Sequence, residues 1–173
     1  PCNWTTDGTT QDWSPVSSYG SSTIDGTAFV IFDDDAAGSS AAPVNVSLIS
    51  PEIDAMGYDT ITLEFDHYWR SYTGTTGYVE VWDGSNWNTI DNLTTTRGSW
   101  SSPVHETYNI TAYQNANLKV RLRYSDGSGT WGWYWAVDNI KIDGTLSPCT
   151  PVRVEVITDI YGSEVSWYIK DIN

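Results

Sequence analysis

One stretch, residues 131–142 (Trp-Gly-Trp-Tyr-Trp-Ala-Val-Asp-Asn-Ile-Lys-Ile), constrains the fold of this chain more than any other. In a β-strand, residues two apart point to the same face. One face of the stretch then carries Trp131, Trp133, Trp135 and Val137, and the other carries Ala136, Asp138, Ile140 and Ile142. Both faces are mainly apolar, which is typical of a central strand. The stretch therefore predicts a β-sandwich with a strand buried on both sides.

Asp138 is the exception on this strand, because it is in phase with Ile140 and Ile142. A buried carboxylate is costly unless it is hydrogen-bonded or bound to a cation. We therefore predict a buried Asp138 with such a partner. The alternative is a β-bulge after Val137 that turns Asp138 out to water.

The rest of the chain reads as short strands separated by Gly, Asp, Asn and Ser, without an amphipathic helix longer than two turns. This pattern predicts an all-β sandwich. Residues 1–27 are polar and predict an irregular N-terminal wrap, and Asp83-Gly-Ser-Asn86 predicts a hairpin turn. The expected strands cover residues 28–32, 46–50, 60–69, 77–82, 87–91, 105–110, 118–124 and 134–142.

Two regions are expected: a sandwich over residues 1–147, and a linker with a β-hairpin over residues 148–173. The hairpin would pair residues 152–157 with 164–170. A hairpin of this length is marginal alone. It packs on the sandwich, pairs with another chain, or begins a further domain, and we favour the last.

The net charge limits which classes of partner the chain can bind, and the cysteines indicate the cellular compartment. The chain has 22 acidic and 8 basic residues and a net charge of −14, so nucleic acid and anionic membranes are poor partners. The sequence contains no run of 18 apolar residues, so we do not expect a membrane-spanning helix. Cys2 and Cys149 bracket the sandwich, and we predict a disulfide between them, as in secreted proteins. The alternative is two free thiols.

Aromatic residues are unusually frequent, with 10 Trp and 11 Tyr. Such rings often lie at binding surfaces, where a sugar can stack on them. We predict ligand contacts at Trp131, which glycines flank, and at Trp133 and Trp69. For each ring, packing in the core or across strands is the alternative. Trp82 and Trp87 straddle the expected hairpin, where they can pair with each other.

The sequence predicts no enzyme. Glu64 and Asp66 share one strand face, as two acids of laminarinase-type glycosidases do, but the third acid of that motif is missing. His67 and His105 are the only histidines, and neither has a Cys nearby in sequence to suggest a zinc site. The Gly-x-Ser-x-Gly motif of serine hydrolases is absent as well.

Several short motifs resemble one family. Asp33-Asp-Asp-Ala-Ala-Gly38, Leu48-Ile-Ser-Pro-Glu-Ile53, Ile61-Thr-Leu-Glu-Phe-Asp66 and Trp135-Ala-Val-Asp-Asn-Ile-Lys-Ile142 follow one another as in the MAM-like jelly roll of exported bacterial proteins. The cleaved-adhesin domains of bacterial haemagglutinin proteases are relatives of this group. The resemblance spans roughly residues 4–144 and implies a jelly roll.

Members of this family are non-catalytic modules of secreted multidomain enzymes and adhesins, and several bind calcium. By resemblance, calcium ligands are expected at Asp138, and with them Asp34 and Asp7. The alternative for Asp33 to Asp35 is a solvated turn. Residues 156–167 resemble the start of a domain that follows such modules in secreted peptidases.

Taken together, the expectation is a secreted, calcium-stabilised accessory module that binds a glycan or a cell or matrix surface beside a catalytic domain, such as a peptidase. Two alternatives remain. A spacer or folding module without a ligand would bury its Trp residues. A protein-binding adhesin would present a flat apolar patch. Glycan binding instead predicts a groove with an exposed Trp131.

Overall fold

A computed structural model describes residues 3–8, 12–37, 43–127, 129 and 131–146. Its elements are β1 (Thr5–Thr6), β2 (Ser14–Val16), β3 (Phe29–Asp33), α1 (Asp34–Ala37), β4 (Asn45–Ile49), β5 (Tyr58–Trp69), β6 (Thr76–Trp82), β7 (Trp87–Leu93), β8 (Val104–Asn109), a 3-10 turn η1 (Thr111–Tyr113), β9 (Lys119–Ser125) and β10 (Tyr134–Leu146).

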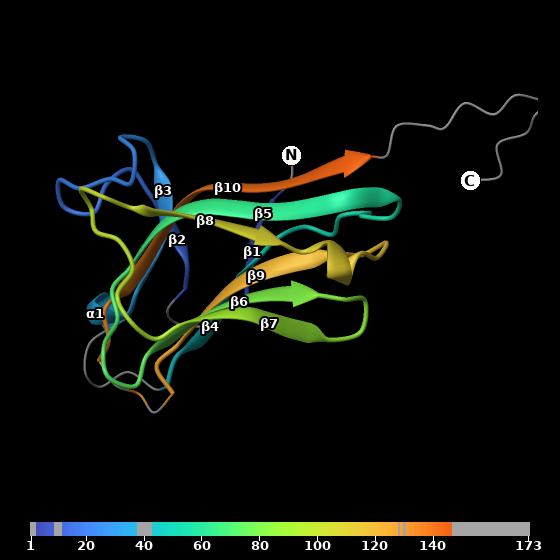
Figure 1. The fold of residues 1–173 in the computed structure, drawn as a ribbon. Coiled ribbons are helices and arrows are strands. Elements are labelled where there is room, and N and C mark those ends of the chain that lie inside the picture. Colours follow the sequence, from blue (N-terminus) through green and yellow to red (C-terminus); the bar gives the residue numbers. More distant parts are fainter. Residues whose placement is uncertain (1–2, 9–11, 38–42, 128, 130, 147–173) are drawn as a thin grey trace, which may run out of the picture.

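The strands form two five-stranded sheets that face each other (Figure 1). The first sheet has the order β1-β4-β9-β6-β7, and the second has the order β2-β3-β10-β5-β8. Every neighbouring pair is antiparallel. The architecture is a jelly-roll β-sandwich, which confirms the predicted all-β class.

All the strands expected from the sequence are present, as β3 to β10. The expected irregular wrap instead contributes two short strands, β1 and β2, which add one edge strand to each sheet. They are two and three residues long and mostly exposed, too short for an alternating pattern to be visible. The linker, the C-terminal hairpin and both cysteines lie outside the described residues, so the domain boundary and the disulfide stay predictions.

The core lies between the sheets, and buried residues alternate with outward-facing ones along strands such as β5 and β9. In β5, Ile61, Leu63 and Phe65 are buried, whereas the residues between them face outward. Trp69 and Trp135, from adjacent strands, meet edge to face with ring centroids 5.5 Å apart. Such aromatic contacts supply much of the buried apolar area of the sandwich.

Strand β10 changes its phase at Asp138. Val137 packs in the core, and so does Ile140, although the two are three residues apart. The pairing with β5 shifts between Asp138 and Lys141, and Asn139 has a φ of 53°. The prediction that Asp138 shares a face with Ile140 is therefore wrong, because a β-bulge intervenes. The alternative bulge is present, one residue later than expected.

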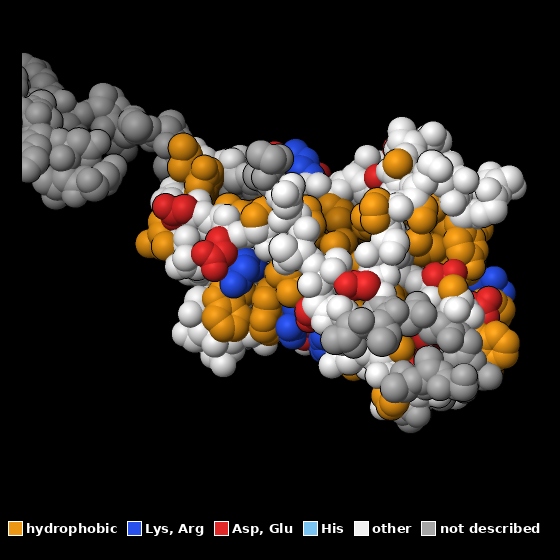
Figure 2. All heavy atoms as spheres, turned by 180° about the vertical axis from the view of Figure 1, so that it is seen from behind, with side chains coloured by type: hydrophobic (Ala, Val, Ile, Leu, Met, Phe, Trp, Pro, Cys, Tyr) orange, Lys and Arg blue, Asp and Glu red, His pale blue; other side chains and the backbone are white. Residues whose placement is uncertain are grey.

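The outer surface is mixed in character. Figure 2 shows hydrophobic side chains on one face interrupted by acidic and basic ones. Within the described residues, the exposed large hydrophobic side chains are those of Met56, Tyr72, Trp131 and Leu146. No helix in this part of the chain is long and apolar enough to cross a membrane.

Candidate ligand-binding site

A hollow of about 220 Å³ lies at the end of the sandwich where α1 begins and β10 starts. Its lining residues are Asp35, Tyr72, Trp131, Gly132 and Trp133. The rings of Tyr72 and Trp131 are 49% and 51% exposed. Two half-exposed rings beside one carboxylate form a site suited to a ligand with both apolar and hydroxyl-bearing faces.

Hydrogen bonds to α1 hold the Trp131 segment. The Trp131 Nε1–H donates to the main-chain oxygen of Asp35 at 2.9 Å. The main-chain N–H of Gly132 donates to Asp34 Oδ2 at 2.8 Å, and the N–H of Asp34 donates to the oxygen of Trp133 at 3.0 Å. These bonds fix the ring of Trp131 at the rim of the hollow.

Asp34 is the centre of this arrangement and is 2% exposed. The Tyr124 hydroxyl also donates to its Oδ2, at 3.1 Å. Burial raises the pKa of Asp34, whereas the bonds from Gly132 and Tyr124 act in the opposite direction. In this structure Asp34 therefore anchors the Trp131 segment, a role that the sequence analysis did not foresee.

The opposite wall is equally well supported. The main-chain N–H of Tyr72 donates to Thr75 Oγ1 at 2.9 Å, and that hydroxyl donates back to the Tyr72 oxygen at 2.8 Å. The guanidinium carbon of Arg70 lies 3.7 Å from the ring centroid of Trp133. This cation–π contact orients Trp133, which is half-buried.

Trp69, the third predicted ligand-contacting ring, is placed differently. It is completely buried and packs against Trp135 and Tyr124. The expectation of a ligand contact is thus corrected: Trp69 is a core residue with no face open to solvent. Its even spacing from Phe65 and Leu63 was the signal for this outcome.

The three predicted calcium ligands lie in different surroundings. Asp7 accepts a hydrogen bond from the main-chain N–H of Ser47 at 2.5 Å, beside the first sheet. Asp34 accepts hydrogen bonds from Gly132 and Tyr124. Asp138 lies on the second sheet at the bulge of β10. Within the described ranges, no group of three or more His, Cys, Asp or Glu side chains is arranged to hold a metal.

Asp138 has an acidic neighbour that the sequence analysis missed, Asp25. The Thr27 hydroxyl donates to Asp25 Oδ1 at 2.6 Å and lies 3.3 Å from Asp138 Oδ2. The Asn139 amide donates to Asp25 at 3.2 Å and to Asp66 at 2.8 Å. Burial raises the pKa of Asp138, and the charge of Asp25 adds to this effect. A cation would relieve the repulsion between the two carboxylates.

The acids considered for glycoside hydrolysis lie on the outer face of the second sheet. Asp66 accepts a hydrogen bond at 2.8 Å from the ring of His105, in addition to that from Asn139. Glu64 lies two residues earlier in β5 and is half-buried. Their surroundings are those of a hydrogen-bonded sheet surface.

The hairpin turn between Trp82 and Trp87 is present as expected. The main-chain N–H of Asp83 donates to the oxygen of Asn86 at 3.1 Å and closes the hairpin. The two indole rings face each other across it, with centroids 5.6 Å apart. The predicted cross-strand pair is confirmed.

Comparison with known proteins gives a fold but no sequence family. No protein-family model matches the chain, and no curated protein matches it. Similar solved structures include the K1 cleaved adhesin domain of Lys-gingipain from Porphyromonas gingivalis W83. Its TM-score is 0.60 at 17% identity, over 81% of this chain and 89% of that one.

Carbohydrate-binding modules are similar as well. TmCBM61, solved with β-1,4-galactotriose, has a TM-score of 0.55 at 15% identity, over 82% of this chain and 88% of that one. The CBM22-1 and GH10 modules of Clostridium thermocellum xylanase 10B, solved with xylohexaose, have a TM-score of 0.52 at 16% identity. That match covers 87% of this chain and 27% of the xylanase chain. At such identities the likeness shows the fold alone. The chain has the jelly-roll β-sandwich fold that these adhesin domains and carbohydrate-binding modules share.

Proposed function

We propose that this domain is a non-catalytic module that binds a glycan in the hollow beside Trp131. The observation that carries the proposal is the pair of half-exposed rings, Tyr72 and Trp131, which line one hollow together with Asp35. The C–H face of a pyranose packs on such rings, and the carboxylate of Asp35 accepts hydrogen bonds from its hydroxyls. The anchored main chain around Gly132 means that little ordering is required on binding.

The fold supports the choice of ligand class. One module of the same architecture was solved with β-1,4-galactotriose, and a chain that joins the CBM22-1 and GH10 modules of a xylanase was solved with xylohexaose. These two oligosaccharides are therefore the first probes. A protein ligand, as expected for an adhesin, is the second candidate, because the domain also has the architecture of a gingipain adhesin domain.

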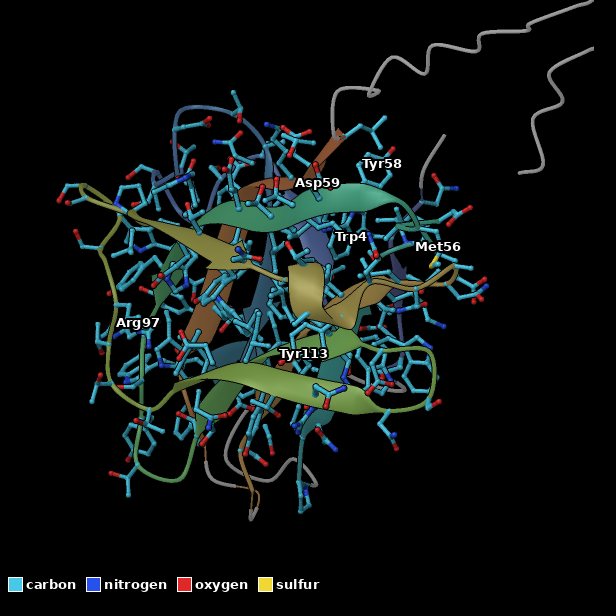
Figure 3. The ribbon with its side chains drawn as sticks, turned by 45° about the vertical axis from the view of Figure 1, so that its right-hand side comes forward. Trp4, Met56, Tyr58, Asp59, Arg97 and Tyr113 are labelled. Carbon is cyan, nitrogen blue, oxygen red and sulfur yellow. The ribbon has the colours of Figure 1, made fainter. Side chains whose placement is uncertain are left out.

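Titration calorimetry with a panel of neutral oligosaccharides, led by these two, tests the proposal. Trp131→Ala and Tyr72→Ala should each weaken binding about tenfold or more, as truncation of a central aromatic contact does. Met56→Ala is the matched control. Met56 is also exposed but does not line the hollow, and it lies at the end of the molecule opposite Arg97 (Figure 3). Equal affinity in the two ring variants and the wild type, or a panel in which nothing binds, contradicts a glycan site at this hollow.

We also propose that calcium stabilises the domain through Asp138 and Asp25, the two residues here that fit a hard cation. Their carboxylates share the Thr27 hydroxyl, and the charge of Asp25 helps to raise the pKa of Asp138. Six to eight oxygen ligands are usual for calcium, so main-chain oxygens and water would complete the shell. Asp34 and Asp7 are left out of this set because each already accepts main-chain hydrogen bonds elsewhere.

Thermal melts of chelated protein, with and without calcium, test this second proposal. Calcium at roughly 100 times its Kd should stabilise the fold by about 3 kcal/mol. The rise in Tm should vanish in Asp138→Asn and persist in Asp7→Asn. No rise in the wild-type protein would remove calcium from the account and leave the glycan proposal untouched.

A last element of the proposal concerns context: the module is exported and directs a neighbouring catalytic domain, such as a peptidase, to its substrate. The xylanase chain that joins CBM22-1 and GH10 modules supports this proposal, because it places two such modules in one polypeptide. A fusion of the domain to a reporter enzyme should gain activity on an insoluble target that carries the glycan. Trp131→Ala should abolish that gain while activity on a soluble substrate stays constant.

A further inference from the structure

The outer face of the first sheet carries an ordered array of aromatic and basic side chains. In β6 and β9, Val79, Val81, Val120 and Leu122 point into the core. By alternation, the residues between them form the outer face. The members of this array, here called the outer platform, are Tyr78, Glu80, Trp82, Trp87, Lys119, Arg121 and Arg123.

Glu80 fixes the two arginines of the outer platform. It is only 3% exposed, although it lies on an outer face. Arg121 Nε donates to it at 2.6 Å, and Arg123 donates through Nε and Nη2, both at 2.9 Å. Burial raises the pKa of Glu80, but the bonds from the two arginines outweigh it and bring the pKa to about 2. Glu80 is therefore ionised at neutral pH.

Aromatic rings cover the cations. The guanidinium carbon of Arg123 lies 3.8 Å from the ring centroid of Tyr78, and that of Arg121 lies 4.3 Å from the ring of Trp87. Trp82 adjoins Trp87, with centroids 5.6 Å apart. The rings and guanidinium groups thus hold one another in place.

Arg121 differs from its neighbours in its free donors. Arg123 uses Nη1 for Asn45 and Nη2 for Glu80, and Lys119 binds Glu52 at 3.3 Å. Among the described residues, neither Nη atom of Arg121 has a hydrogen-bond partner. Its side chain is 19% exposed, and its two Nη atoms are the guanidinium donors that remain for a ligand. A carboxylate is the ligand that matches this fork in shape and charge.

Stability alone does not explain why this face carries ion pairs instead of apolar side chains. A desolvated ion pair contributes little net stability compared with apolar side chains of similar volume. The array does give a rigid surface on strands, which is the best support for a recognition site. The chain as a whole carries a net charge of −14, so a long polyanion is repelled, whereas a single carboxylate at Arg121 meets a local positive charge.

We propose that the outer platform binds a uronic acid residue of an acidic glycan. Its carboxylate pairs with the two Nη atoms of Arg121, and its pyranose ring packs against the indole of Trp82, beside the guanidinium that Trp87 holds in place. This site lies on the first sheet and is separate from the hollow beside Trp131, so it does not depend on the proposed function. Its ligand differs as well, because the fork selects a charged sugar.

Calorimetric titration with trigalacturonate, and with β-1,4-galactotriose as the neutral counterpart, tests the proposal. Trigalacturonate should bind the wild-type protein, and its affinity should fall as salt is added. Arg121→Gln and Trp87→Ala should each lower that affinity about tenfold or more. Arg121→Lys should lower it as well, since lysine keeps the charge but lacks the fork.

Two control variants and one substitute variant make the outcome decisive. Lys141→Gln removes an exposed cation from the second sheet and should leave trigalacturonate binding unchanged. Trp131→Ala should also leave it unchanged, while it weakens any binding of the neutral sugar. If Arg121→Gln does not fold, the double variant Glu80→Gln with Arg121→Gln removes both charges and serves instead. No binding of trigalacturonate, trigalacturonate binding that survives loss of Arg121, or trigalacturonate binding that is lost in Trp131→Ala overturns the proposal.

Discussion

Asp34 Oδ2 and the main-chain nitrogen of Gly132 lie 2.8 Å apart, and this hydrogen bond leaves no room for a side chain at position 132. A Cβ there would overlap the Asp34 carboxylate and the Tyr124 hydroxyl. The bond ties the helix after β3 to the segment that presents Trp131. The glycine is therefore required by close approach and not by a turn.

Gly132→Ala should lower stability by about 1–3 kcal/mol, the usual cost of forcing extra volume into a packed site. It should also weaken glycan binding, since the Trp131 segment must move. Urea unfolding and calorimetry measure the two effects. Trp131→Ala is the control: it should weaken binding but change stability by only about 0.5 kcal/mol, because the ring is half-exposed. A Gly132→Ala protein as stable as wild type would contradict the packing argument.

The acid sensitivity of the fold should have one component from Glu80. Its pKa is about 2 in the folded state against an ordinary value of 4.5, so the folded state favours the ionised form. Stability from this group is present above pH 4.5 and is lost as the pH falls toward 2. The full loss is on the order of 3 kcal/mol.

Glu80→Gln should remove that dependence and lower stability at pH 7, since Arg121 and Arg123 lose their shared partner. Urea unfolding at several pH values checks both effects. Asp143→Asn, which removes an exposed acid paired with Lys141, is the control and should leave the acid limb in place. An unchanged slope in Glu80→Gln would show that the ion pairs do not hold Glu80 ionised.

His67 should give a second component at higher pH. It is fully buried, and burial lowers its pKa from 6.5 to about 4, with Glu106 and Arg97 acting in opposite directions. The folded state therefore favours neutral His67. Its contribution is present above pH 6.5 and is lost as the pH falls toward 4.

His67→Gln tests this component, because the amide stays neutral and retains an acceptor for the Trp135 Nε1–H, which His67 Nδ1 accepts at 3.1 Å. The slope of the unfolding free energy between pH 6.5 and 4.5, the window above the Glu80 transition, should then change by the His67 contribution. His105→Gln, on the exposed histidine, should leave the wild-type slope. The same slope in His67→Gln and wild type would rule out His67 as its source.

Arg97 should stabilise the side of the sandwich where β7 and β8 are edge strands. Its Nη1 donates to Asp91 of β7 at 2.5 Å and to Glu106 of β8 at 2.9 Å, and so joins the edge strands of the two sheets. Figure 3 shows Arg97 beside these strands. Arg97→Gln should cost about 1–2 kcal/mol, because charge-assisted bonds at a partly exposed site are lost.

Hydrogen exchange gives a sharper readout of the same change. Amides of β7 and β8 should exchange faster in Arg97→Gln, while those of β3 and β10 stay protected. Arg70→Gln is the control, because Arg70 contacts Trp133 instead of an edge strand. Uniform acceleration across all strands would mean that Arg97 acts on global stability only.

The sequence predicted most of the fold because alternation is a local property. In β5, Ile61, Leu63 and Phe65 identify the buried face without reference to any other strand. Trp69 continues the same alternation and is buried in the core. The high tryptophan content of the chain predicted a ligand contact for it instead. Trp131 was recognised from its flanking glycines, a local signal as well.

Relationships between distant residues were not predictable in this way. Asp25 and Asp138 are far apart in sequence, and only the pairing of β3 with β10 brings them together. The anchoring role of Asp34 likewise depends on Tyr124, which lies in another sheet. A triplet of acids suggests a cation on composition alone, whereas the burial that turns one of them into an acceptor is a property of the fold.

The bulge in β10 has a consequence for which residues the core can do without. The four residues from Asp138 to Lys141 face the three from Asp66 to Glu64, so the strand holds one surplus residue. If Asn139 were excised, Val137 and Ile140 would fall into plain alternation on the inner face, and the interior would keep every side chain it has. The outer face would lose the amide that joins Asp25 to Asp66. Asn139 is thus dispensable for folding but necessary for the acidic surface, and a one-residue deletion separates the two.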